Sequence, residues 1–463
     1  MDASNVVDST EGNGLKRHAS WRSAFIISLG GSLLVAVSLG PMAADLGPAS
    51  VVVWTITALV GLVQCLLITE LAGMFPHKAG GTATYTHEAF RDKPLLGAFS
   101  NWGYWLGWLP VIPVNLILAA GYLNATVLPH TGVLTIALVL GAAMYALNYF
   151  GLRPGVWSSA VVAVCAFVPL AIIAFSPIFK PSLFHAAYVF PMRPLNGSWT
   201  SGASWMLVIK WMFVAVWSSY AFESASSVVA ELKDPHKEAP RAITAAAVVG
   251  VLVYALMPFM LLSIVGTDAL AKDPMVAFLP AAKAIFGDTG AAIVAIMLIA
   301  ALLLGVMTAI IGSSRTVYEM SRDGLTLQQF ARVNRYGVPV GSMYWDAAVT
   351  LTLLIVFKDN VVNIVAASNV GYIIPFILIP IAYVRLRRLV PAFPRPFKLA
   401  PIFGTAAIII AAYNAFLLAV GGPLWGGKVM LTGGIIMLTF VPFYAIRRGA
   451  DRRRQVATAA APA

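Results

Sequence analysis

The stretch that decides the fold is residues 213–243, which read FVAVWSSYAFESASSVVAELKDPHKEAPRAI. Within it, residues 217–226 place four serines and one carboxylate, Glu223, near the middle of a membrane-length apolar segment. A charge inside a bilayer costs ~2.5–3.5 kcal/mol, so we expect Glu223 to face a polar cavity or a partner. A helix interrupted by polar groups at mid-membrane indicates a transport site. The alternative is a kinked helix whose serines bond back to their own backbone carbonyls.

The composition of the whole chain indicates an all-α membrane protein. Of its 463 residues, 59% are hydrophobic and only 11% are charged, and the mean hydropathy is +0.83. A membrane-spanning helix needs about 20 predominantly apolar residues. The sequence therefore predicts 12 transmembrane helices, at residues 23–46, 50–74, 95–124, 131–150, 156–178, 203–229, 241–266, 288–317, 343–358, 361–385, 399–420 and 428–446.

The basic residues indicate how these spans are oriented in the lipid bilayer. Most of the 31 lysines and arginines fall in loops on the side of the N-terminus, which the positive-inside rule makes cytoplasmic. We therefore expect cytoplasmic tails at residues 1–21 and 448–463 and an external loop at 179–202. The expected protein is a multi-pass protein of the inner or plasma membrane, and its net charge of +12 does not indicate a nucleic-acid partner.

The first span carries an interruption of its own, at Gly30-Gly31-Ser32. Glycine in a helix interior costs roughly 1 kcal/mol relative to alanine, so two adjacent glycines are expected to serve a purpose. An unwound turn here would expose the backbone amides of the following half-helix, which suit a carboxylate. The alternative purpose is close helix packing through small residues.

The first and sixth spans are thus the two with polar, small-residue interruptions, and they lie five spans apart. Two inverted five-helix repeats with a broken first helix would give this spacing. The predicted repeats are residues 22–178 and 203–388, followed by two further spans within 389–447.

Polar and aromatic residues of the second and third spans are expected to be structural. Glu70, near the inner end of the second span, should cap its helix or pair with a basic loop residue. Trp102, Tyr104, Trp105 and Trp108 of the third span should form an interfacial belt or pack between helices.

Four motifs in the right order resemble the amino acid–polyamine–organocation transporter superfamily, whose members have the LeuT-type fold. The motifs fall between about residues 25 and 400 and match the family's sixth helix and following loop, its second-to-third-helix loop, the end of its eighth helix and the exit of its tenth. They are Trp217-Ser218 to Ile243, Met74-Phe75-Pro76 to Tyr85, Ser314-Arg315 to Leu325, and Arg395-Pro396-Phe397-Lys398.

The resemblance implies a site for a zwitterion between the two interrupted helices. Backbone amides of the first interruption would hold the substrate carboxylate, and carbonyls around 217–221 would accept its ammonium. Trp217 would be an aromatic lid, and Glu223 a proton-linked or structural carboxylate below it. The implied substrate-binding residues are Gly30, Gly31, Ser32, Leu33, Trp217, Ser218, Tyr220, Ala221 and Phe222.

Three departures from the family pattern concern the substrate. Leu33 replaces the second glycine of the first-helix motif, and Ala221 replaces a glycine of the sixth helix. Ala309 stands where arginine/agmatine exchangers carry a tryptophan that stacks on the guanidinium. Arginine is therefore not expected as the substrate.

The coupling ion, proton or sodium, stays open in the sequence. Proton-coupled relatives often place a lysine on the fifth helix, and that lysine is missing near Cys165. Thr308, Ser313 and Ser314 offer hydroxyls for a sodium site, although such hydroxyls more often bond to their own helix.

The sequence thus predicts a secondary transporter, not an enzyme, with no cofactor and no metal. No histidine falls inside an expected span, which disfavours a membrane-embedded enzyme. A neutral amino acid is favoured as the substrate because no second intramembrane carboxylate is evident near Glu223. The alternatives are a polyamine or amine carrier or exchanger and a transporter-like sensor, and the oligomeric state is left open.

Overall fold

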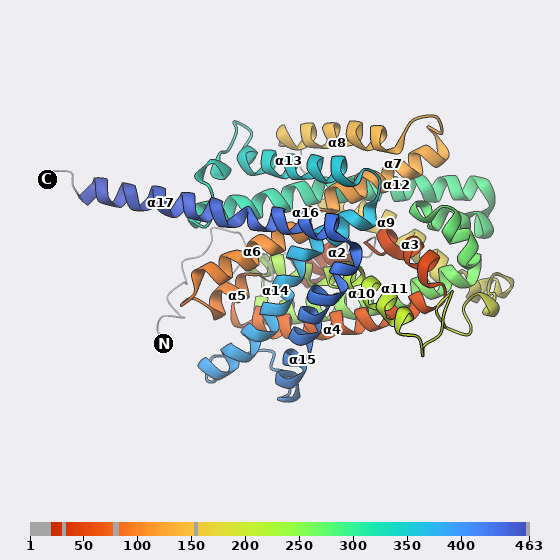
Figure 1. Cartoon of the computed structure of the whole chain (residues 1–463), viewed down its shortest axis with the longest axis horizontal. Coiled ribbons are helices and arrows are strands. Elements are labelled where there is room, and N and C mark those ends of the chain that lie inside the picture. The colour runs from red at the N-terminus through yellow and green to blue at the C-terminus, as the bar shows by residue number, and fades with distance from the viewer. Residues whose placement is uncertain (1–19, 30–33, 77–82, 152–155, 460–463) are drawn as a thin grey trace.

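The protein is helical throughout the part of the chain that the structure describes. This computed structural model describes residues 20–29, 34–76, 83–151 and 156–459, and Figure 1 shows its long helices packed beside one another. The α-helices are α2 (Trp21–Leu29), α3 (Ala36–Leu46), α4 (Ala49–Met74), α5 (Ala83–Ala89), α6 (Pro94–Trp108), α7 (Val111–Thr126), α8 (Val133–Tyr149), α9 (Val156–Phe179), α10 (Gly202–Ser219), α11 (Pro235–Lys272), α12 (Phe278–Arg322), α13 (Val340–Phe357), α14 (Val361–Leu389), α15 (Ile402–Phe416), α16 (Gly427–Leu438) and α17 (Phe440–Ala459).

These helices make the chain a multi-pass membrane protein. Within the described residues, nine helices are long and apolar enough to cross a membrane, or up to ten if the bent pair 167–179 and 181–188 forms one span. The expected fourth span is present as α8, an apolar helix of 17 residues. The expected first span is present as α2 and α3, which flank residues outside the described part. The count of twelve spans and the inverted repeat remain predictions.

Two glycines mark where the seventh span ends and where the eighth begins. α11 and α12 are longer than predicted, but each contains one glycine with a backbone conformation that is not helical: Gly266 at φ 75° and Gly287 at φ 71°. Only glycine adopts positive φ at low cost, so each helix turns there. The predicted boundaries, 266 and 288, coincide with these turns.

The predicted external loop and the predicted C-terminal tail contain more helix than expected. The loop at 179–202 includes the short 3₁₀ helices η2 (Pro181–Leu183) and η3 (Ala186–Tyr188). The tail continues α17 beyond its apolar part, and the helix projects from the rest of the molecule (Figure 1). Arg447 holds its base by donating to Asp451 (2.9 Å) and to the Ser321 carbonyl (3.0 Å).

The core lies where α4, α6, α10, α11 and α14 meet. These five helices supply most of the largest side chains with almost no exposed surface, whereas α15 and α16 direct large apolar side chains outward. Outward residues such as Ile409 and Leu431 suit contact with lipid. The most buried large side chains of the five core helices are Trp54, Trp102, Trp105, Phe213, Trp217, Tyr254, Tyr372 and Tyr383.

A buried ion-pair cluster joins the C-terminal ends of α4 and α14. Glu70 is fully buried and accepts from Arg387 at 2.9 and 2.6 Å and from the Leu399 amide at 2.8 Å. Arg395, in the loop after α14, lies 3.3 Å from the same carboxylate. The expected pairing of Glu70 with a basic loop residue is confirmed.

We predict that Glu70→Gln lowers the free energy of unfolding by about 3 kcal/mol or more, because it leaves buried arginine charges without their partner. Thermal unfolding of the purified protein in detergent measures this loss. The matched control is Asp92→Asn, because Asp92 pairs with Arg385 through a side chain that is 44% exposed. An exposed pair contributes about 1 kcal/mol or less. Equal losses in the two variants would contradict the assigned role of Glu70.

Candidate functional site

The interruption predicted in the sixth span is present as a change of helix type. α10 ends at Ser219, and the chain continues after Tyr220 as the 3₁₀ helix η4 (Ala221–Glu231). Runs of 3₁₀ helix longer than three or four residues are uncommon, and inside a longer helix they often mark a hinge or strain. The change occurs among serines whose side chains offer the backbone alternative hydrogen bonds.

Serine side chains connect this change of helix type to the first span. Ser218 Oγ donates to the carbonyl of Leu34 at 3.0 Å, and Ser224 Oγ donates to Ser28 Oγ at 3.3 Å. Ser28 and Leu34 stand on either side of the predicted first interruption. Its residues Gly30, Gly31, Ser32 and Leu33 lie outside the described part of the chain, so their role in holding a carboxylate stays a prediction.

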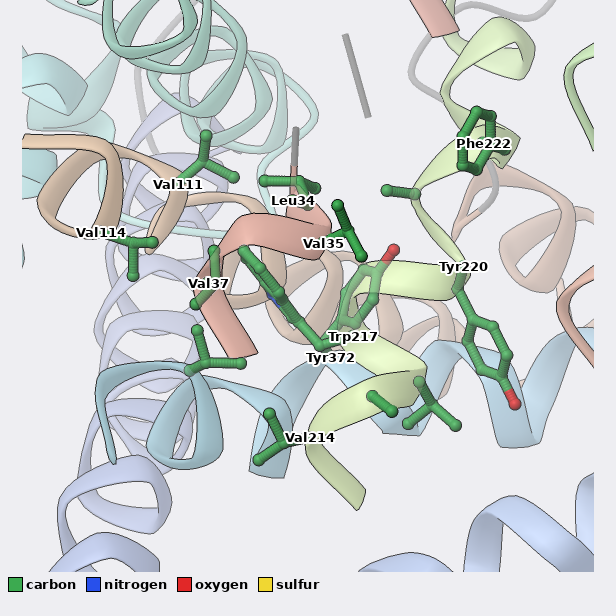
Figure 2. Packing of buried hydrophobic residues seen from close by; sticks show 14 of the residues in the cluster. Leu34, Val35, Val37, Val111, Val114, Val214, Trp217, Tyr220, Phe222 and Tyr372 are labelled. Atoms are coloured by element: carbon green, nitrogen blue, oxygen red, sulfur yellow. The ribbon is translucent and has the colours of Figure 1, made fainter. Parts of the chain in front are cut away.

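Trp217 lies at the centre of the buried cluster and is held by a hydrogen bond. Its Nε1 donates to the Gly107 carbonyl of α6 at 2.7 Å, and its side chain is almost fully buried. Gly107 is required there, because a Cβ at this position would lie 1.8 Å from the Tyr372 ring. Figure 2 shows Trp217 and Tyr372 together in the middle of the cluster. A lid movement of Trp217 would have to break this bond.

Tyr220 and Phe222, both predicted to bind substrate, direct their side chains away from Trp217 (Figure 2). Tyr220 Oη donates to Asn414 of α15 at 2.8 Å. Phe222 meets Tyr254 of α11 edge-on, with 5.6 Å between ring centroids. Their side chains therefore pack against α15 and α11 and do not face Trp217. A contribution of this stretch to substrate binding would come through its backbone, as it would at Ala221.

Glu223 is fully buried and both of its oxygens are engaged by neutral donors. Tyr104 of α6 donates to Oε1 at 2.7 Å, and Ser226 donates to Oε2 at 3.0 Å. The expectation of a partner for this carboxylate is confirmed. Tyr104 and its neighbour Trp105 are themselves buried, so the third-span aromatics include packing residues and not only an interfacial belt.

The structure adds one residue that sequence reasoning missed. Asp346 of α13 is fully buried and accepts from Trp105 Nε1 at 2.8 Å and from Ser313 Oγ at 2.6 Å. The available signal was its position as an acidic residue inside the predicted ninth span. The spans therefore contain a second buried carboxylate, which contacts α6 and α12 and not the interrupted helices.

The three hydroxyls considered for sodium do not converge on one point. Thr308, Ser313 and Ser314 each donate to the carbonyl four residues earlier, at 2.9, 2.8 and 2.6 Å. Thr308 is exposed, and only Ser313 also reaches a carboxylate. The alternative of hydroxyls bonded to their own helix therefore describes all three.

Comparison with known proteins agrees with this arrangement. The sequence profile of a family described as amino acid permease matches residues 20–441, nearly the whole chain. The chain belongs to this family. It is thereby a membrane transporter of the amino acid–polyamine–organocation superfamily.

The relatives of this permease include proteins named for different substrates. An uncharacterized transporter of Legionella pneumophila is 24% identical, over 87% of this chain and 91% of its own. The lysine-specific permease LysP of Escherichia coli is 25% identical, over 95% of both chains. The polyamine transporter RMV1 of Arabidopsis thaliana is 26% identical, over 73% of this permease and 66% of its own length.

We predict that Ser218→Ala lowers the free energy of unfolding by about 1 kcal/mol, because it leaves the Leu34 carbonyl without its donor. The neighbouring Ser219 provides the control, since its buried Oγ has no hydrogen-bond partner among the described residues. Thermal unfolding of Ser219→Ala should show no loss of stability. A loss in Ser219→Ala as large as that in Ser218→Ala would argue against the connection between the two interruptions.

Proposed function

We propose that the protein is a secondary active permease that carries amino acids across the cytoplasmic membrane by alternating access. The observation that supports this most is the hydrogen bond from Ser218 to Leu34, which joins the changed helix of the sixth span to the edge of the first interruption. In the proposed topology both termini are cytoplasmic, and twelve spans include two five-helix repeats. The first and sixth spans would move together against the rest.

The proposed binding step uses backbone groups freed by the two interruptions. A zwitterion requires hydrogen-bond donors for its carboxylate and acceptors for its ammonium a few ångströms away. The amides around Gly31 would supply the donors, and carbonyls near Trp217 the acceptors. Backbone groups serve this purpose without placing a further formal charge in the membrane.

A cationic amine is the second candidate substrate, and a specific observation favours it. Glu223, in the changed helix of the sixth span, is a fully buried carboxylate that accepts from Tyr104 and Ser226. Named relatives include a lysine-specific permease and a polyamine transporter. A positively charged side chain could be balanced by Glu223, so the proposal covers lysine-like amino acids and polyamines as well as neutral amino acids.

Uptake by the purified protein in lipid vesicles tests the proposed function. Vesicles loaded with an unlabelled amino acid or polyamine should accumulate the labelled form of the same solute from outside. An excess of unlabelled solute added outside should suppress this uptake. Trp217→Ala should raise KM about tenfold, equivalent to ~1.4 kcal/mol, because the bound solute loses its aromatic cover.

Trp217→Phe is the matched variant, since it keeps a ring and removes the N–H that donates to Gly107. Its KM should stay within a few-fold of the wild-type value. An unchanged KM in Trp217→Ala would remove Trp217 from the lid role. Absence of uptake for every amino acid and polyamine would contradict the proposed function and favour a sensor.

A further inference from the structure

A buried carboxyl–hydroxyl pair lies apart from the two interruptions. Asp346 of α13 and Ser313 of α12 are 0% and 2% exposed, and their Oδ2 and Oγ atoms are 2.6 Å apart. The other carboxylate oxygen, Oδ1, accepts from Trp105 Nε1 of α6. Three helices thus meet at one titratable group for which the proposed substrate site has no use.

The hydrogen bonds of Ser313 accommodate Asp346 with or without a proton. Ser313 has one hydroxyl hydrogen but two acceptors in reach, the Ala309 carbonyl at 2.8 Å and Asp346 Oδ2 at 2.6 Å. When Asp346 is ionised, Ser313 donates to it. When Asp346 is protonated, it donates to Ser313 Oγ, and Ser313 donates to Ala309. Neither state requires a side chain to move.

Among the described residues, no positively charged side chain forms an ion pair with Asp346. Tyr145 of α8 lies nearby and binds Thr350, one turn along α13, while Tyr104 of α6 binds Glu223. Arg315 of α12 lies at the adjoining cavity described below.

The other elements packed against α13 contribute little charge. Helix α7 and the 3₁₀ helix η6 (Gln328–Ala331) contain no Asp, Glu, Lys or Arg. The arginines of α14 lie in its last turns, where Arg387 binds Glu70 and Arg385 binds Asp92. An ionised Asp346 would therefore be a buried charge with hydrogen bonds only, and a proton would remove that charge.

A small cavity adjoins the pair on the side that the proposed topology makes cytoplasmic. It has a volume of about 20 Å³ and is lined by Ser314, Met343, Asn148 and Arg315 among others. Ser314 follows Ser313 in the chain, and Met343 precedes Asp346 by three residues. A volume of about 10–15 Å³ suffices for one water molecule, so a water here could exchange a proton with the pair.

A sodium ion fits these contacts less well. Sodium would require several oxygen ligands around Asp346, whereas Oδ1 faces an N–H donor from Trp105. The remaining oxygens in reach are Ser313 Oγ and the Ala309 carbonyl that it contacts. The contacts around Asp346 and Ser313 therefore suit a proton but leave too few oxygen atoms for a sodium ion.

We propose that Asp346 and Ser313 form a proton site that binds one proton from the cytoplasmic side and couples it to transport. Proton binding converts the Asp346 carboxylate to a neutral carboxyl group, and release restores the charge. The binding part stands on the contacts alone. The coupling part rests on the proposed function.

Infrared difference spectroscopy of the purified protein tests proton binding without any substrate. A pH step should reveal a carboxylic-acid C=O band that is absent in Asp346→Asn and shifted in Ser313→Ala. Thr352→Ala is the matched control, because the exposed Thr352 hydroxyl of α13 donates to the Ala348 carbonyl of its own helix, and its band should equal that of the wild type. Size-exclusion elution confirms that each variant is folded. If Asp346→Asn does not fold, the band shift in Ser313→Ala decides the test.

Two spectral results would overturn the proton site. One is a pH-difference spectrum of Asp346→Asn identical to the wild-type spectrum, with Ser313→Ala unchanged as well. The other is loss of the band on adding sodium chloride but not choline chloride, which would assign sodium to Asp346.

Vesicle uptake tests the coupling. Wild-type uptake should be stimulated by a pH gradient, and Asp346→Asn should keep exchange between labelled and unlabelled solute but lose this stimulation. Full stimulation in Asp346→Asn would overturn the coupling. Absence of any wild-type uptake would overturn the proposed function, while the infrared result would still decide the proton site.

Discussion

The constraint on which the structure depends is that a bilayer offers no water to satisfy backbone hydrogen bonds. A helix can change type inside the membrane only if protein groups take over the freed donors and acceptors. Ser218 does this between two distant segments, because it donates to the carbonyl of Leu34 beside the first interruption. The hydrogen bond that satisfies the Leu34 carbonyl therefore also joins the first and sixth spans.

Helix α6 connects this junction to the second buried carboxylate. Tyr104 and Gly107, which lie on one face of α6, bind Glu223 and Trp217. Trp105, one position further round the helix, binds Asp346 instead. Helix α6 thus contacts both the proposed substrate site and the proposed proton site, which gives the two sites a physical connection.

The chain of apolar segments and the interruption in the sixth span could be predicted from the sequence, because hydropathy and span length are local properties. The turns at Gly266 and Gly287 also coincide with the predicted end of the seventh span and the predicted start of the eighth. The destinations of individual side chains could not be predicted in the same way. Tyr220 would share a face with Trp217 in a continuous α-helix, yet the change of helix type directs its ring toward α15.

The contacts of Asp346 could not be predicted from the sequence either. Its partners Trp105 and Ser313 come from two other helices, and no local pattern around residue 346 predicts them. The contacts of Gly30, Gly31, Ser32 and Leu33 remain predictions of the family resemblance, supported by the placement of their neighbours Ser28 and Leu34.

The most direct test of the central claim, a zwitterion site where the two interruptions meet, is ligand-dependent thermal stability of the purified protein. A ligand that binds the folded state at 100 times its Kd stabilises it by about 2.7 kcal/mol. We predict stabilisation by a free amino acid, lost when either its carboxyl or its amino group is blocked, and weaker in Ser218→Ala than in Ser219→Ala. Equal stabilisation by the blocked and the free compounds would contradict the claim.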